Sequence, residues 1–187
     1  MIRLALVLSV LALQGCAAVI VAGGVGVAAS AHDRRTIGTQ IDDKTLTARI
    51  SNNLSENKNL DEFAHVSVNV FNGIAILVGQ TPNDDLRNQA EQAAKNVQHI
   101  RKLHNQIRIG SPTSTGTRAN DVWLASKVKT NLIADKRIDG LHIDIVVEDS
   151  EVFLMGLVNE NEANIAVDIA RNIGGVARVV KAFEYLN

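Results

Sequence analysis

The strongest constraint on this chain is an internal repeat. The segment that starts at Asp43 aligns with the segment that starts at Asp121, at an offset of 78 residues, and later segments align at offsets of 77 and 76. Two single-residue gaps suffice over about 65 residues, a length typical of one small domain. The chain of 187 residues is long enough for two such units. We therefore expect two small domains that share one architecture.

Each copy contains the same order of helices and strands. It opens with apolar residues at four-residue spacing, which predicts an amphipathic helix: Leu46, Ile50 and Leu54 in the first copy, Leu124, Val128 and Leu132 in the second. Two alternating strands follow, joined in the first copy by a hairpin turn at Asn72–Gly73. A second helix (83–97 and 160–173) and a last strand (100–109 and 176–186) close each copy. We expect the first helices to be N-capped by Asp42 or Asp43 and by Asn120 or Asp121.

This order predicts an α+β fold of two tandem αββαβ modules. In each module two helices should pack on one face of a small three-stranded mixed sheet. The expected domain organisation is a signal peptide at 1–15, a tether at 16–40, a first module at 41–110, a polar linker at 111–118 and a second module at 119–187.

The N-terminus has the pattern of an export signal that ends in a modified cysteine. A basic start, an apolar run from Leu4 to Leu13 and small residues before Cys16 are typical of a signal peptide. Leu13–Gln14–Gly15–Cys16 resembles the lipobox of bacterial lipoproteins, in which the cysteine becomes the acylated first residue of the mature protein. The alternative is a membrane-spanning helix from Leu4 to Ala31. Three glycines, each worth roughly 1 kcal/mol against a helix, and Gln14 disfavour it.

A lipidated Cys16 predicts an Ala/Val/Gly-rich tether and a stable acyl anchor in a membrane. Resemblance to lipoprotein sorting in Gram-negative bacteria adds a location. Ala17, rather than Asp, after the cysteine favours the inner leaflet of the outer membrane, facing the periplasm.

Composition and motif searches exclude several function classes. The formal charge of −1 gives no general preference for polyanions, so we expect no nucleic-acid partner. The five histidines and the single cysteine form no metal-binding spacing, and no nucleophile motif is present. Acidic pairs fall at predicted helix starts and turns, where acids cap or are solvated. We therefore predict no enzymatic activity, no metal and no cofactor.

The repeated helix, the motifs Val78–Gly79 and Leu154–Met155–Gly156, and the helix and strand after them resemble the BON domain. Together with the lipobox and the tether they are similar to the dual-BON outer-membrane lipoproteins, over nearly the whole chain. The resemblance implies binding of anionic phospholipid through the first helix of the second copy. It also implies support of outer-membrane integrity and concentration at the division septum.

The second copy has its own candidate lipid site. At about 100° per residue, Trp123 lies roughly 140° from the apolar line of its helix and so points outward. An outward Trp beside a lysine suits a membrane interface, and residues 118–137 carry five basic against two acidic residues. Lys127 fits a phosphate-binding role better than Lys129, which falls on the opposite flank. The candidate phospholipid-binding residues are Val122, Trp123, Ser126, Lys127, Thr130 and Ile133.

Two alternatives stay open. Trp123 could instead pack against the other copy or the linker, which would also cover an outward helix face. The chain could also be a lipid-anchored adaptor that binds outer-membrane assembly proteins without recognising lipid through its modules. In the lipid-binding interpretation the expected partners are phosphatidylglycerol and cardiolipin.

Overall fold

The computed structural model describes residues 33–186, and the predicted signal peptide, Cys16 and most of the tether lie outside them. Residues 34–187 form one compact unit of the chain. The unit contains two apolar cores between helices and sheets and a third cluster between the sheets. Residues 34–187 therefore contain their own apolar cores, and we expect them to fold without the preceding residues.

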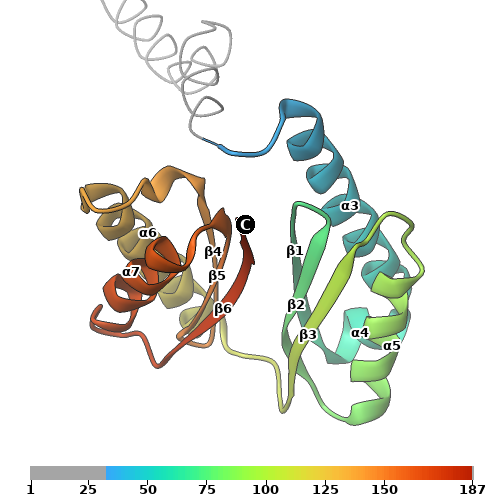
Figure 1. Cartoon of the computed structure of the whole chain (residues 1–187). Coiled ribbons are helices and arrows are strands. Elements are labelled where there is room, and N and C mark those ends of the chain that lie inside the picture. Colours follow the sequence, from blue (N-terminus) through green and yellow to red (C-terminus); the bar gives the residue numbers. More distant parts are fainter. Residues whose placement is uncertain (1–32, 187) are drawn as a thin grey trace, which may run out of the picture. The chain divides into compact units, whose positions relative to one another are not determined.

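The first module (residues 37–109) has three helices on one face of a three-stranded sheet (Figure 1). Its order is α3 (Ile37–Glu56), the short α4 (Lys58–Phe63), β1 (His65–Phe71), β2 (Ile74–Thr81), α5 (Asp84–Lys95) and β3 (Lys102–Ile109). The strand order is β1-β2-β3, antiparallel between β1 and β2 and parallel between β2 and β3.

The second module (residues 115–185) repeats this arrangement with a 3-10 turn in place of α4 (Figure 1). It contains α6 (Thr115–Ala134), η2 (Gly140–His142), β4 (Ile143–Glu148), β5 (Glu151–Val158), α7 (Glu160–Arg171) and β6 (Arg178–Tyr185). The sheet again has one antiparallel and one parallel pair. The predicted fold of two tandem αββαβ modules with mixed sheets is confirmed.

The first helix of each module begins earlier than the apolar spacing suggests. α3 starts at Ile37, inside the range assigned to the tether, and α6 starts at Thr115, inside the range assigned to the linker. The N-caps are Thr36 and Ser114, whose hydroxyl oxygens accept hydrogen bonds from backbone amides in the first turn. The prediction that Asp42 or Asp43 and Asn120 or Asp121 are the caps is therefore wrong. The extra turns contribute no buried residue to the core, so hydrophobic periodicity could not detect them.

The central strands β2 and β5 are buried on both faces. Ala75 and Leu77 of β2 pack toward the helices, whereas Ile76 and Val78 belong to an apolar cluster with Phe153 and Met155 of β5. Phe71 and Ala182 complete this cluster. The module sheets thus use the face that carries no helix to contact each other.

Candidate functional site

The predicted lipid-binding residues lie on the outward side of α6, which we call the α6 outer face: Val122, Trp123, Ser126, Lys127, Thr130 and Ile133. The opposite side of the helix is fully buried through Leu124, Val128 and Leu132. Val122 is 69% exposed, Trp123 57% and Ile133 48%. Three large apolar side chains on one exposed face leave an area of hydrocarbon in water that a partner could cover.

Lys127 and Trp123 form a pair on this face. The Lys127 ammonium lies 4.9 Å from the centroid of the indole ring, within the range of a cation–π contact. The same ammonium donates a hydrogen bond of 3.2 Å to the carbonyl of Gly174, after α7. The lysine is therefore held beside the ring, with capacity left for an anion, because an ammonium has three donors.

The two hydroxyl residues of the face hydrogen-bond their own helix. Ser126 Oγ donates to the Val122 carbonyl at 3.0 Å, and Thr130 Oγ1 donates to the Ser126 carbonyl at 2.9 Å. Both side chains are exposed, and their oxygens remain free to accept hydrogen bonds. They form a polar strip between the apolar residues. Because each hydroxyl hydrogen is already donated to a helix carbonyl, neither side chain has a donor left for a phosphate.

The interdomain alternative for Trp123 does not match this geometry. The modules contact each other through their sheet faces, in the cluster around Ile76 and Phe153, and Trp123 is absent from that cluster. More than half of its side chain stays exposed. Of the two placements considered from the sequence, the structure has the exposed one.

Lys129 has a different task from Lys127. Its ammonium donates to three backbone carbonyls, those of Gly140 at 2.9 Å, Leu141 at 3.1 Å and Ile143 at 2.7 Å. These groups belong to η2 and the start of β4, so Lys129 fastens that segment to α6. This use explains why the lysine on the opposite flank is unsuited to a phosphate.

The basic character of residues 118–137 is smaller than the residue count suggests. Arg137 is paired with Asp135, and this guanidinium lowers the pKa of the carboxyl to about 2. Arg118 contacts Nδ1 of His65 at 3.2 Å. With Lys129 bound to carbonyls, the positive charges that remain on the solvent side are chiefly those of Lys127 and Lys136. Charge at the α6 outer face therefore depends on Lys127.

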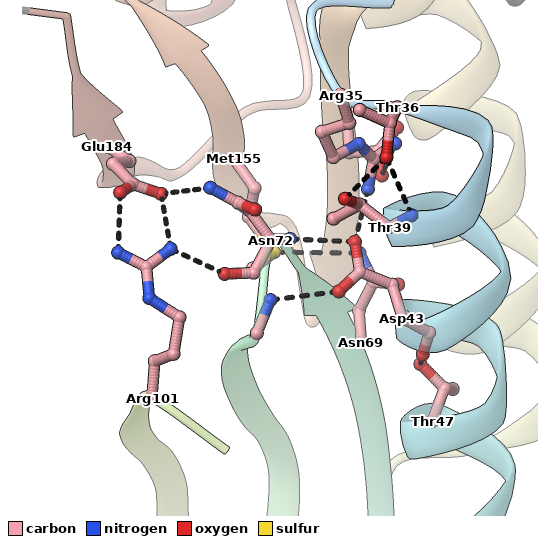
Figure 2. A network of polar contacts seen from close by, with 12 residues as sticks. Arg35, Thr36, Thr39, Asp43, Thr47, Asn69, Asn72, Arg101, Met155 and Glu184 are labelled. Carbon is pink, nitrogen blue, oxygen red and sulfur yellow. Dashed lines mark hydrogen bonds and ion pairs between the residues drawn. The ribbon is translucent and has the colours of Figure 1, made fainter. Parts of the chain in front are cut away.

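Sequence reasoning missed the role of two buried aspartates. Asp43 lies inside α3, where its carboxylate accepts hydrogen bonds from the backbone amides of Asn72 at 2.7 Å and Gly73 at 2.8 Å (Figure 2). Asp121 does the same in α6 for the amides of Asp149 at 2.8 Å and Ser150 at 2.9 Å. Each carboxylate ties a helix to the hairpin turn of its own module. The one available signal was the match of Asp43 with Asp121 in the repeat.

Two consecutive arginines were also missed, because they lie in the range assigned to the tether. Arg34 binds Glu162 in the second module at 2.6 Å and the Leu157 carbonyl at 2.9 Å. Arg35 binds Asp43 in the first module at 2.8 Å (Figure 2). Its guanidinium also lies 3.7 Å from the centroid of the Phe71 ring.

Residues 33–186 contain no cluster of three or more His, Cys, Asp or Glu side chains able to hold a metal ion. No helix within the same residues is long and apolar enough to cross a membrane. Cys16, the predicted lipidation site, lies outside them.

The comparisons with known proteins agree with the duplicated fold. The BON domain model matches residues 42–111 and 120–187. The outer membrane lipoprotein DolP of Haemophilus influenzae is 37% identical over 94% of this chain and 91% of its own length. A 21 kDa hemolysin of Actinobacillus pleuropneumoniae is 32% identical over 82% of this chain and 79% of its own.

Among solved structures, the C-terminal domain of CdsD, a type III secretion protein of Chlamydia trachomatis, aligns with 78% of this chain and 67% of its own. Its identity of 15% and TM-score of 0.31 are too low to bear on function. Neither the BON model nor the name of the DolP relative states an enzymatic activity. Two BON matches that cover most of the chain, with the similarity to DolP over nearly all of it, show that this protein belongs to the BON-domain family, as a DolP-like dual-BON lipoprotein.

Proposed function

We propose that this protein is a non-enzymatic lipoprotein whose second module binds anionic phospholipid through the α6 outer face. The observation that carries the proposal is Trp123, more than half exposed, with the Lys127 ammonium 4.9 Å from its ring centroid. A Trp ring prefers the headgroup depth of a bilayer, and a lysine beside it meets lipid phosphates there.

The neighbouring side chains fit the same use. Val122 and Ile133 are exposed on the same face and can enter the acyl boundary, while Ser126 and Thr130 stay at headgroup level. A basic residue near an anionic surface contributes about 1 kcal/mol, so this contact is weak alone. An acyl anchor on Cys16 would keep the module close to the membrane and make a weak contact effective.

The proposed setting is the inner leaflet of the outer membrane, with the modules in the periplasm. Cys16 would carry the acyl chains, and Ala17 after it would direct the protein outward. Phosphatidylglycerol and cardiolipin are the anionic lipids proposed as ligands. Recognition of such lipids would place the protein where outer-membrane integrity is maintained, including the division septum.

The test uses residues 34–187, without acyl chains, and vesicles with or without phosphatidylglycerol or cardiolipin. Binding is followed by sedimentation and by the fluorescence of Trp123, the single tryptophan of the chain. We expect binding to anionic vesicles only, with a blue-shifted emission. Lys127→Gln should weaken it about fivefold, which corresponds to the loss of one basic contact. Trp123→Ala, measured by sedimentation, should weaken it further.

The matched control is Lys181→Gln, which removes an exposed lysine from β6 of the same module and should leave binding unchanged. Equal losses for Lys127→Gln and Lys181→Gln would mean that only net charge matters, against a defined site. No binding to either vesicle type would reject lipid recognition by the modules. The adaptor hypothesis would then gain support, and the search would turn to outer-membrane assembly proteins.

A further inference from the structure

The first module has a cavity where the second module has its Trp–Lys pair. The cavity, of about 420 Å³, lies beside α3 and the hairpin turn, and we call it the module 1 pocket. Thr45 and Arg49 in its wall match Trp123 and Lys127 at the repeat offset of 78 residues. A small side chain therefore stands where the second copy has an indole, and the space is open.

The other wall of the pocket also has a counterpart. The amide of Arg101 donates to the Gly73 carbonyl at 2.8 Å, and the amide of Ala177 donates to the Ser150 carbonyl at the same distance. Arg101 therefore corresponds to Ala177, and His99 to Gly175. The first copy carries two basic or titratable side chains where the second carries none.

These side chains leave the pocket with unused hydrogen-bond donors. The side chains of Arg49 and His99 make no hydrogen bond or ion pair with the described residues. Arg101 pairs with Glu184 through two hydrogen bonds, of 2.8 and 3.2 Å, and donates to the Asn72 carbonyl at 2.9 Å (Figure 2). Its charge is thus matched by Glu184, but part of its five-donor fork stays unused.

The acidic residues of the wall do not cancel these cations equally. The Asp43 carboxylate is already satisfied by Arg35 and by two backbone amides (Figure 2). The Asp42 side chain has no partner within residues 33–186, and Asp42 lies seven residues before Arg49 on α3, roughly 10 Å away along the helix axis. The end of the pocket formed by Arg49, His99 and Arg101 is therefore the one suited to an anion.

The backbone conformation of His99 is a second indication that the module 1 pocket is a functional site. His99 has φ +73°, and Gly175 at the matching position has φ +105°. A side chain in this left-handed region costs about 1–2 kcal/mol, which glycine avoids. The first module thus keeps a strained histidine in the pocket wall where the second has glycine, and such strain is concentrated at functional sites.

We propose that the module 1 pocket binds one phosphate group, with Arg49 as its charged donor and with the unused N–H groups of Arg101 and the side chain of His99 as further contacts. Two guanidinium groups around one cavity suit the geometry of a phosphate better than that of a halide. The group could belong to a lipid headgroup or to a free phosphate ester, because both present the same anionic oxygens. This site is separate from the α6 outer face and does not depend on it.

The test is an NMR titration of residues 34–187 with inorganic phosphate, with glycerophosphoglycerol (a lipid headgroup without acyl chains) and with acetate. We expect saturable shifts of the amides around Gly73 and His99, with a Kd of about 1 mM for a phosphate compound. Binding of the diester alone assigns the pocket to headgroups, and binding of both compounds assigns it to phosphate esters in general. Arg49→Glu should weaken binding at least tenfold.

Three variants separate the proposal from other causes. Lys58→Glu makes the same charge change on α4, outside the pocket, and should leave the titration unchanged. Lys127→Glu should also leave it unchanged, so failure at the α6 outer face is distinguishable from failure here. His99→Gly should raise the melting temperature, because it relieves strain, and yet weaken binding; a purely structural histidine would show only the first effect.

The proposal is overturned if neither phosphate compound shifts these amides, if acetate shifts them as strongly, or if Arg49→Glu binds phosphate as well as the original chain does.

Discussion

At the scale of single residues, the two hairpin turns achieve one conformation with different sequences. Asn72 and Gly73 have φ values of +49° and +72°, and Asp149 and Ser150 have +48° and +63°. Asn–Gly is the preferred pair for such a turn, whereas the left-handed conformation is energetically unfavourable for serine. The buried Asp121 offsets this cost, because its carboxylate accepts hydrogen bonds from both turn amides.

Ser150→Gly should therefore stabilise the protein, by about 1 kcal/mol. The amide that Asp121 binds and the carbonyl that Ala177 binds both remain in the variant. Urea unfolding of residues 34–187 measures the change. The reciprocal Gly73→Ser should destabilise the first module by a similar amount, and a destabilising Ser150→Gly would contradict this account of the turn.

Trp123 and Asp43 show which features of single residues could be predicted from the sequence and which could not. The exposure of Trp123 followed from helical spacing alone, because the buried line Leu124, Val128 and Leu132 fixes which side of α6 faces outward. The role of Asp43 could not be deduced in this way. An aspartate near an apolar helix has the local pattern of a cap, but its partners here are backbone amides about thirty positions away along the chain.

At the scale of helices and strands, β2 and β5 form the contact between the two sheets, which the sequence did not predict. The expected order placed helices on one face of each sheet and gave the other face no partner. Both strands lack polar alternation, as in Ala75–Val78 and Val152–Met155, a pattern typical of strands buried on two faces. That pattern was present in the sequence, but it does not say which surface covers the second face.

Lys129 connects helix α6 to η2 and to the start of strand β4 through its side-chain hydrogen bonds. Lys129→Met keeps most of the apolar stem and removes the donors to three carbonyls, so we expect a loss of about 1–3 kcal/mol in the free energy of unfolding. Lys127→Met removes one exposed hydrogen bond and should cost less. Urea denaturation compares the two, and equal losses would show that the three carbonyls do not depend on Lys129.

At the scale of the whole described unit, the sheet contact is bordered by polar pairs between modules. Arg101 and Asn72 of the first module bind Glu184 of the second (Figure 2), Arg108 binds Asp149, and Gln80 binds the buried Glu148 at 2.8 Å. The hydrogen bonds from Arg101, followed by the weaker one from Asn72, hold the pKa of Glu184 below its ordinary value of 4.5.

This lowered pKa predicts that the folded unit loses stability as the pH falls. Because the folded pKa of Glu184 is lowered, its contribution to stability is complete above pH 4.5 and is lost as pH falls through the folded pKa. Glu184→Gln should thus lower the melting temperature at neutral pH, and its deficit should shrink as the pH falls from 4.5 through the lowered pKa of Glu184. Thermal unfolding across this range measures the effect.

The control for the acid prediction is Glu56→Gln, which changes an exposed carboxyl of α3 that makes no ion pair with the residues that the structure describes. Its melting temperature should follow that of the original chain at every pH. A deficit for Glu184→Gln that stays constant from neutral to acid pH would mean that the ion pair does not couple folding to protonation.

The contacts of Arg34 and Arg35 have a mechanical consequence. Adjacent along the backbone, they contact both modules: Arg34 binds Glu162 of the second, and Arg35 binds Asp43 of the first and lies 3.9 Å from Asp144 of the second. A pulling force that reaches the unit along the chain before Arg34 is divided there between both modules. A protein held at its N-terminus and moved by its surroundings would then respond as one object instead of being peeled apart one module at a time.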